Sequence, residues 1–213
     1  YFVKIMNQKN SLGLNSCFLD LNDPIELFRV WMDEAKKTEP NDPTAFSLAT
    51  SKKNGIPSVR MILLKDFSEE GFAFYTNLES QKSKEIKENL NAAMCFHWKS
   101  LQRQIRVSGS ISKIKDELAD KYYETRSYES KIGAWASKQS STLKDREQLI
   151  KSIEEYKLKY SDKKNVPRPD YWSGWNLSPI NIEFWLRVDG RIHERLLYTK
   201  NQKETWNKSL LSP

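Results

Sequence analysis

The stretch Arg103-Gln104-Ile105-Arg106-Val107-Ser108-Gly109-Ser110-Ile111 alternates apolar and polar side chains with a period of two. From residue 105 onward the apolar or small residues stand at odd positions, and the polar residues stand at even positions. Successive side chains of a β-strand point to opposite faces, so this alternation predicts a strand with one buried face. We therefore expect residues 103–114 to form a half-buried strand.

Further strands are expected on both sides of this one. Asn54-Gly55 is the strongest hairpin signal in the chain, and Asp189-Gly190 marks a second turn near the other end. Aromatic and β-branched runs around these turns predict strands over residues 45–50, 58–65, 72–76, 92–98, 180–188, 191–199 and 204–211.

Helices are expected between the strands. They are predicted from Asp23-Pro24, an N-cap followed by proline, to before Pro40, and over residues 80–89, 117–126, 132–136 and 146–160, with a loop at 167–179. Hairpins at both ends predict an α+β fold, mainly β, with a closed or nearly closed antiparallel barrel and helices packed outside. Residues 1–22 lack a period and are expected to form an irregular N-terminal arm, leaving residues 23–213 as a single domain.

Charge and composition narrow the class of protein. The chain has 213 residues, and 35 Lys and Arg against 28 Asp and Glu give a net charge of +7, which favours anionic partners. Cys17 and Cys95 lie far apart, so neither a disulfide framework nor a zinc site is expected. With two histidines, a multi-histidine metal site is excluded, and the absence of a long apolar run or signal sequence favours a cytoplasmic protein without membrane contact.

No phosphate-binding glycine loop, nucleophile elbow or metalloprotease motif is present, so an enzyme here would depend on an organic cofactor. The unusual feature is arginine within strand patterns, at Arg60, Arg103, Arg106, Arg191 and Arg195. A buried cation needs an acid or a bound anion, and acids are few in these segments. Each arginine alone could simply point outward, but Arg191, His193 and Arg195 share strand parity and would line one face as an anion clamp.

Three other segments carry polar groups that could bind a ligand. The helix expected from Ser80 leaves backbone N–H groups free for an anion. Tyr122, Arg126 and Ser130 step by four and would converge on one phosphate if the helix continues, although an ordinary solvated face is the alternative. The run 137–141 offers hydroxyls, an amide and an ammonium, whereas Trp185 alone is better explained as a core aromatic.

Several of these motifs occur together in an order that resembles one enzyme family. They are Arg60-Met61-Ile62-Leu63-Leu64-Lys65, Tyr75-Thr76-Asn77, Arg103-Gln104, Ile132-Gly133-Ala134-Trp135-Ala136-Ser137-Lys138-Gln139-Ser140-Ser141, Glu183-Phe184-Trp185 and Arg191-Ile192-His193-Glu194-Arg195. From about Asp23 to Pro213 the chain resembles the pyridoxamine 5′-phosphate oxidase family. The resemblance implies an antiparallel split β-barrel of about six to eight strands and a homodimer with FMN at the subunit interface.

The resemblance also implies an activity: FMN-dependent oxidation of pyridoxamine or pyridoxine 5′-phosphate to pyridoxal 5′-phosphate, with dioxygen as acceptor and hydrogen peroxide as product. The implied FMN contacts are Arg60, Met61, Ile62, Leu63, Leu64, Lys65, Tyr75, Thr76, Lys82, Gln104, Gln139, Ser140, Trp185 and Arg195. The implied substrate contacts are Lys65, Tyr122, Arg126, Ser130, Arg191 and His193, of which Arg191 and His193 are the implied catalytic residues. No metal is required, and the two phosphates and the flavin would neutralise the strand-borne cations.

The chain departs from the family pattern at several positions. Gln81 replaces a usual arginine, which predicts weaker FMN affinity than in a Gln81→Arg variant. Other departures fall at 173–176, at Leu186-Arg187, at Glu194, and at Asn7-Gln8-Lys9-Asn10, where relatives have Arg-Arg-x-Tyr. Three alternatives therefore stay open: a related split-barrel flavoprotein with another substrate, such as a phenazine-pathway oxidase, an FMN- or pyridoxal-phosphate-binding protein with little turnover, and, least favoured, a nucleic-acid binder.

Overall fold

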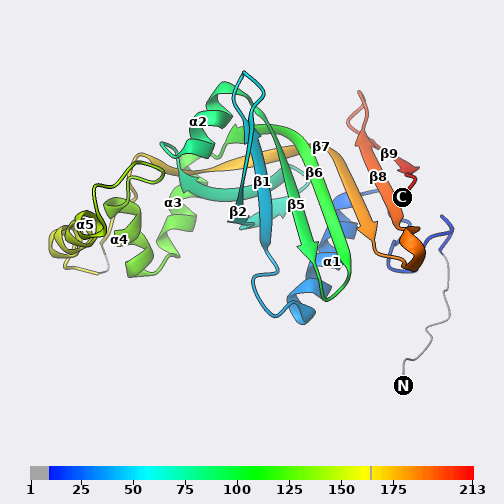
Figure 1. Ribbon diagram of the computed structural model, residues 1–213, viewed down its shortest axis with the longest axis horizontal. Helices are drawn as coiled ribbons and strands as arrows, with labels where there is room; N and C mark the ends of the chain where they lie inside the picture. The colour runs from blue at the N-terminus through cyan, green and yellow to red at the C-terminus, as the bar shows by residue number, and fades with distance from the viewer. Residues whose placement is uncertain (1–9, 164) are drawn as a thin grey trace.

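The computed structural model describes residues 10–163 and 165–213, and its main element is one curled antiparallel sheet (Figure 1). In the described residues the sheet has nine strands, one more than expected: β1 (Ala45–Ser51), β2 (Pro57–Leu63), β3 (Asp66–Ser68), β4 (Gly71–Asn77), β5 (Asn91–Trp98), β6 (Arg103–Lys113), β7 (Trp172–Leu186), β8 (Glu194–Lys200) and β9 (Trp206–Leu210). Around it lie α1 (Pro24–Thr38), α2 (Gln81–Glu88), α3 (Asp116–Glu124), α4 (Tyr128–Ala136), α5 (Arg146–Lys159) and the 3₁₀ turn η1 (Asp189–Arg191).

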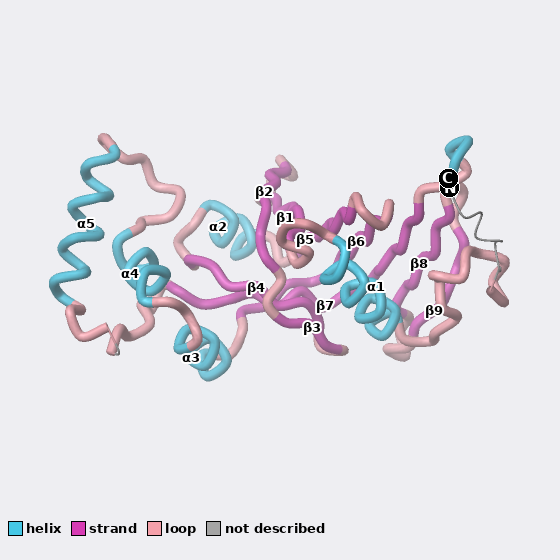
Figure 2. The backbone as a smooth tube through the Cα atoms, turned by 90° about the horizontal axis from the view of Figure 1, so that it is seen from below, coloured by secondary structure: helices cyan, strands magenta, loops and turns pink. Residues whose placement is uncertain are grey.

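The long strand β7 divides the sheet. Along one edge it pairs with β6, while along the other edge its first part pairs with β4 and its last part with β8. The path β2-β1-β5-β6-β7 therefore leads to two separate branches, β4-β3 and β8-β9. This branching produces a split barrel, as the sequence predicts. Helices α2 to α5 lie at the β4 end of the molecule, and β8 and β9 lie at the other end (Figures 1 and 2).

Helix α1 fills the concave side of the sheet. Asp23 accepts a hydrogen bond from the Ile25 N–H and Pro24 occupies the first turn, so the helix begins where the sequence predicts. Phe28 is fully buried and meets Phe72 and Phe96 edge to face, with ring centroids 4.9 and 5.2 Å apart. Edge-to-face packing of aromatic rings adds stabilisation beyond the area that they bury. The core therefore fixes how the sheet curls around α1.

The described part of the predicted N-terminal arm, residues 10–22, is irregular but packs on the domain. Leu14 and Phe18 are buried in the same core as α1. The indole N–H of Trp31 donates to the Cys17 carbonyl at 2.8 Å, and the Asn15 N–H donates to Glu194 Oε2 at 2.7 Å. The predictions for residues 1–9, including the altered segment at 7–9, lie outside the described residues.

Two expectations about the chain near Pro179 and Arg191 are wrong. Residues 172–179 form the first part of β7 rather than a loop, because Pro179 lies opposite Gly109 at a register shift where the missing N–H is tolerated. A Cβ at Gly109 would come within 2.0 Å of the Ser178 carbonyl oxygen, so the bulge requires glycine. Strand β8 begins at Glu194 rather than at Arg191, which has a φ of 62° in η1.

The Asn54-Gly55 hairpin is confirmed: β1 and β2 pair antiparallel, and Gly55 has a φ of 79°.

No helix among the described residues has the length and apolar character needed to span a membrane.

Candidate active site

A first cavity of about 370 Å³ opens between β2, the start of α2 and the turn after α4. Its lining includes predicted site residues from three distant segments: Ser58, Val59, Arg60, Met61, Ile62, Gln81, Lys82, Gln139 and Ser140. Strand β2 places Arg60 and Ile62 on its more covered face, while Met61 and Leu63 project outward. Leu64 is buried below the end of β2 and Lys65 is exposed beyond it.

Lys82 is the only buried lysine among the described residues, with 6% of its surface exposed. Its Nζ lies 3.1 Å from Thr76 Oγ1, 3.2 Å from Ser80 Oγ and 3.2 Å from Gln139 Oε1, all neutral oxygens. Within the described chain no carboxylate forms an ion pair with it. Burial, together with the nearby Arg60 charge, lowers the pKa of Lys82 to about 8. A buried ammonium without a counter-ion fits an anionic ligand in this cavity.

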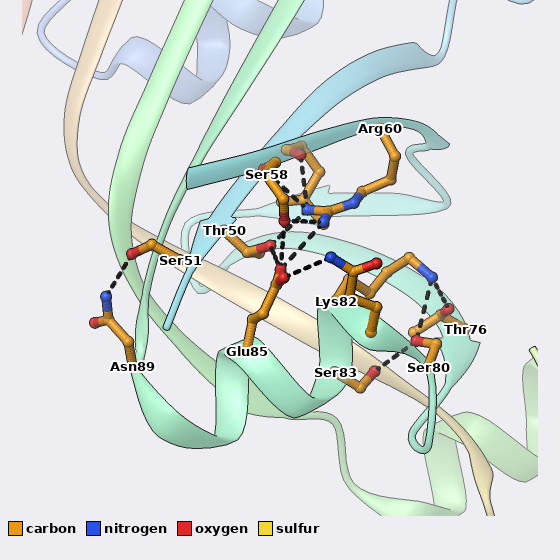
Figure 3. A network of polar contacts seen from close by, with 12 residues as sticks. Thr50, Ser51, Ser58, Arg60, Thr76, Ser80, Lys82, Ser83, Glu85 and Asn89 are labelled. Atoms are coloured by element: carbon orange, nitrogen blue, oxygen red, sulfur yellow. Dashed lines mark hydrogen bonds and ion pairs between the residues drawn. The ribbon is translucent and has the colours of Figure 1, made fainter. Parts of the chain in front are cut away.

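Arg60, by contrast, has a protein counter-ion. Its Nη2 lies 3.1 Å from Glu85 Oε2, and the same carboxylate accepts hydrogen bonds from Thr50, Ser58 and Gln81 (Figure 3). Burial opposes ionisation of Glu85, but the hydrogen bonds and the Arg60 charge outweigh it and lower the pKa of Glu85 to about 2. Glu85 thus orients Arg60, and Gln81, which replaces an arginine of the family pattern, donates to Glu85 instead of adding a charge.

Acid should weaken the fold through Glu85. Because the pKa of Glu85 falls from 4.5 to about 2 on folding, its contribution is present above pH 4.5 and is lost as the pH drops toward 2. Urea unfolding should show this contribution shrinking by about 2 kcal/mol between pH 5 and pH 3. Glu85→Gln should lose that part of the pH dependence, whereas Glu88→Gln, at an exposed position of α2, should keep it. Equal pH dependence in both variants would contradict the assignment.

A second cavity, of about 380 Å³, adjoins the first, since both are lined by Ile62 and Gln139. One wall is aromatic: the rings of Tyr75 and Tyr122 stack at 4.2 Å, and Trp172 stacks on Tyr75 at 5.5 Å. Arg126 and Ser130, both predicted substrate contacts, line this cavity with Thr76. The pocket therefore combines flat apolar surface with one cation, as a ring-bearing anion requires.

The helix does not continue from Tyr122 through Arg126 to Ser130, so the condition for these three residues to share one helix side is not met. Helix α3 ends at Glu124, and Ser127 caps the new helix α4 by accepting a hydrogen bond from the Ser130 N–H. Arg126 and Ser130 still meet, because Arg126 Nη2 donates to the Ser130 carbonyl at 2.9 Å, and both line the second cavity. Tyr122 stacks on Tyr75 and is not part of the cavity lining. The Arg126 guanidinium lies 4.7 Å from the Trp172 ring centre, and burial lowers its pKa.

The remaining predicted residues form a second cluster on β6, β7, β8 and η1. Gln104 lies opposite Trp185 in the β6–β7 register, and Trp185 lies opposite Arg195 in the β7–β8 register. The His193 ring packs on Trp185 with centroids 4.6 Å apart, and its Nδ1 accepts from the Val188 N–H at 3.2 Å. In a neutral imidazole ring, that bond places the ring proton on Nε2. Arg191 is exposed on η1.

The structure thus separates the predicted site into two halves. Strands β1, β5 and β6 lie between β2, which holds Arg60, and β7, which holds Trp185. In Figure 1, α2 and α4, which border the two cavities, lie to the left of strands β1, β5 and β6, and β8 lies to their right. The expectation that Arg191, His193 and Arg195 line one face of one strand is wrong, because only Arg195 is in β8. One chain alone does not bring the two halves together.

The expectation that ligand anions neutralise all strand-borne arginines needs a further correction. Arg103 pairs with Glu34 of α1, and its guanidinium lies 4.6 Å from the Trp31 ring centre. Arg106 and Arg195 share Glu183 at 3.0 and 2.8 Å. The carboxylates come from distant segments, which is why the local sequence seems poor in acids.

Some residues at these cavities had no predicted role. Ser58 and Trp172 line a cavity and lie outside the quoted motifs, while Gly133 and Ala134 line one from within a quoted motif. Ser137, from the predicted run 137–141, also lines the second cavity. Thr50, Glu85 and Glu183 orient a site cation across the fold, which local sequence does not indicate.

Comparison with known proteins defines first the class and then the family. In fold, the chain is similar to a pyridoxamine 5′-phosphate oxidase-related, FMN binding protein from Nostoc punctiforme PCC 73102, with a TM-score of 0.71 at 17% identity over 90% of this chain and 98% of that one. It is also similar to PhzG from Burkholderia lata 383, whose structure contains tetrahydrophenazine-1-carboxylic acid, with a TM-score of 0.87 at 28% identity over 96% and 100% of the two chains. The molecule therefore has the split-barrel fold of these two proteins.

Sequence comparison gives the family. The family profile described as Pyridoxamine 5′-phosphate oxidase matches residues 32–160, and that of the Pyridoxine 5′-phosphate oxidase C-terminal dimerisation region matches residues 172–213. A pyridoxine/pyridoxamine 5′-phosphate oxidase from Pelagibacter ubique strain HTCC1062 is 64% identical over 208 residues, 98% of this chain and 100% of the relative. One from Brucella anthropi is 51% identical over 92% and 97% of the two chains. The chain belongs to the pyridoxamine 5′-phosphate oxidase family.

Proposed function

We propose that this protein oxidises pyridoxamine or pyridoxine 5′-phosphate to pyridoxal 5′-phosphate, with FMN as cofactor and dioxygen as acceptor. The observation that supports this most is the buried Lys82 ammonium, which faces a cavity with neutral oxygens around it. That cavity suits the FMN phosphate, and the adjoining one, with its aromatic wall and Arg126, suits a phosphorylated pyridine ring. Two free cysteines, Cys17 and Cys95, agree with a cytoplasmic setting.

The proposed active unit is a homodimer. Trp185, Arg191, His193 and Arg195 all fall in the region matched by the dimerisation profile, residues 172–213. We infer that this cluster faces the Lys82 and Arg126 cavities of a second copy, because within one chain Trp185 lies at the end of β7 opposite to Trp172, which lines the Arg126 cavity. Each dimer would then hold two equivalent FMN sites at the subunit interface.

In this arrangement the protein binds, orients and excludes water, and bound FMN supplies the hydride acceptor. Lys82, Arg60 and Ser140 would hold the cofactor phosphate, with Gln139 fixing the Lys82 amine. Arg126, Ser130, Tyr122 and Lys65 would hold the substrate phosphate beside the Tyr75 ring. Arg191 and the protonated Nε2 of His193 would orient the substrate ring and assist proton movement.

Peroxide release tests the activity. The FMN-loaded protein should release hydrogen peroxide and form pyridoxal 5′-phosphate when pyridoxamine 5′-phosphate is added in air. Pyridoxamine without its phosphate is the matched control and should react far more slowly, because Arg126 and Ser130 would lose their ligand. A flavin-loaded protein that releases no peroxide with either phosphorylated substrate would overturn the proposal.

The structural likeness to PhzG supports one alternative, a flavoprotein that acts on a tricyclic carboxylic acid. The 64% identity to the Pelagibacter ubique oxidase over nearly the whole chain favours the phosphorylated pyridine. Turnover of tetrahydrophenazine-1-carboxylic acid in place of pyridoxamine 5′-phosphate would reverse this preference.

A further inference from the structure

Glu183 is a buried carboxylate on the sheet face opposite the core. Its neighbours Ile182 and Phe184 are buried on the concave side, and strand alternation therefore turns Glu183 to the other face of β7. Its side chain is only 8% exposed, yet it lies among strands whose outer residues are mostly small. A charge in such a place is costly unless it is paired.

Two arginines pair with this carboxylate, one on each oxygen. Arg106 Nη1, on β6, lies 3.0 Å from Oε2, and Arg195 Nε, on β8, lies 2.8 Å from Oε1. The Arg106 side chain is 60% exposed and the Arg195 side chain only 24%. Arg195 is therefore the partner that the fold encloses, whereas Arg106 extends toward the surface.

The contacts of Arg195 leave one edge of its guanidinium available. Nε is bound by Glu183, and Nη1 donates to the Ser212 carbonyl at 2.8 Å. Neither contact uses Nη2. Trp185 lies directly opposite Arg195 in the strand register, so the two side chains project from the same face of the sheet. A side chain with many rotamers is thereby confined to one orientation.

We propose that Glu183 is a positioning residue that fixes the Arg195 guanidinium in the orientation needed to contact the flavin. This inference rests on the proposed function, which makes Arg195 and Trp185 cofactor contacts. Glu183 itself is bound on both oxygens by protein cations and has no role as a ligand contact. Its effect on FMN passes through Arg195.

A double-mutant cycle on FMN binding tests this. Apoprotein would be titrated with FMN, and quenching of flavin fluorescence would give the dissociation constant. Glu183→Ala should weaken binding by roughly tenfold, the scale of one charge-assisted hydrogen bond, and so should Arg195→Ala. In the Arg195→Ala background, Glu183→Ala should change the dissociation constant less than twofold, because its target is gone.

Two further variants separate positioning from other roles. Glu183→Gln keeps an acceptor for Arg195 Nε, so its FMN affinity should fall less than threefold. This variant can also replace Glu183→Ala in the test if the alanine variant does not fold. Arg106→Ala removes the other cation from Glu183 and should leave FMN binding within twofold of wild type. Additive losses in the cycle, or equal losses for Glu183→Ala and Glu183→Gln, would overturn the inference. Wild-type apoprotein that binds no FMN would instead overturn the proposed function and this inference with it.

Discussion

FMN binding should be roughly 10- to 100-fold weaker in Lys82→Met than in the wild-type protein. Losing one charge-assisted hydrogen bond in a buried site weakens binding by about that factor. Lys82 is the cation of the first cavity that has no carboxylate partner in the described chain, so its charge is available to the cofactor phosphate. Methionine fills a similar volume, and the Ser80 and Thr76 hydroxyls can still bond to their neighbours. Fluorescence titration of the apoprotein measures the effect.

Lys84→Met is the matched control for this variant. Lys84 lies on the same helix at an exposed position, and the substitution removes the same charge. Its FMN affinity should stay within about twofold of wild type, as is typical of an exposed charge. Similar losses in both variants would show that net charge, rather than the buried ammonium, attracts the cofactor.

A pH series adds a second readout. Burial and Arg60 lower the pKa of Lys82 to about 8, so the apoprotein loses this ammonium as the pH rises through 8. Wild-type FMN affinity should therefore decrease above pH 8, and the Lys82→Met protein should lack that decrease. The same pH profile in both proteins would assign the dependence to another group.

Turnover of Arg191→Ala should fall by roughly a hundredfold while FMN stays bound, the scale of an orienting or proton-assisting group. Arg191 is exposed on η1 and makes no core contact, so its removal should leave the fold intact. It also lies outside the cluster around Lys82 that would hold the cofactor phosphate. The effect should therefore appear in kcat with pyridoxamine 5′-phosphate and not in the FMN dissociation constant.

Arg146→Ala, at the exposed start of α5, removes an equal charge from a residue that lines neither cavity and should keep full turnover. If Arg191→Ala turns over like this control, Arg191 has no part in the reaction. If it loses FMN, its role is in cofactor binding.

Local sequence patterns predicted most of the secondary structure. The period-two run at 103–111 is strand β6, and Asn54-Gly55 forms the hairpin of β1 and β2, because both signals act between near neighbours. Local sequence predicts a loop for residues 172–179, because proline argues against a strand. The segment is a strand because Gly109, on the opposite strand, forms the bulge that accommodates Pro179. That compensation lies 70 residues away in sequence.

The candidate site was predictable as a set of residues but not as an arrangement. Motif resemblance selected Lys82, Arg126 and Trp185, and the first two do line adjoining cavities. Pairings such as Glu85 with Arg60 and Glu183 with Arg195 connect residues whose spacing in sequence has no regular period. Periodicity could not indicate them, because they depend on which strands the barrel brings together.

Strand β7 has one more consequence. Trp172, beside the Arg126 cavity, and Trp185, beside Arg195, stand at opposite ends of one continuous strand. At about 3.3 Å per residue, the path along the strand between them is about 40 Å. In the proposed dimer, the two impaired variants Lys82→Met and Arg191→Ala would therefore complement each other when their subunits are mixed. One site of the mixed pair would receive both substitutions, and the other site would be entirely wild type.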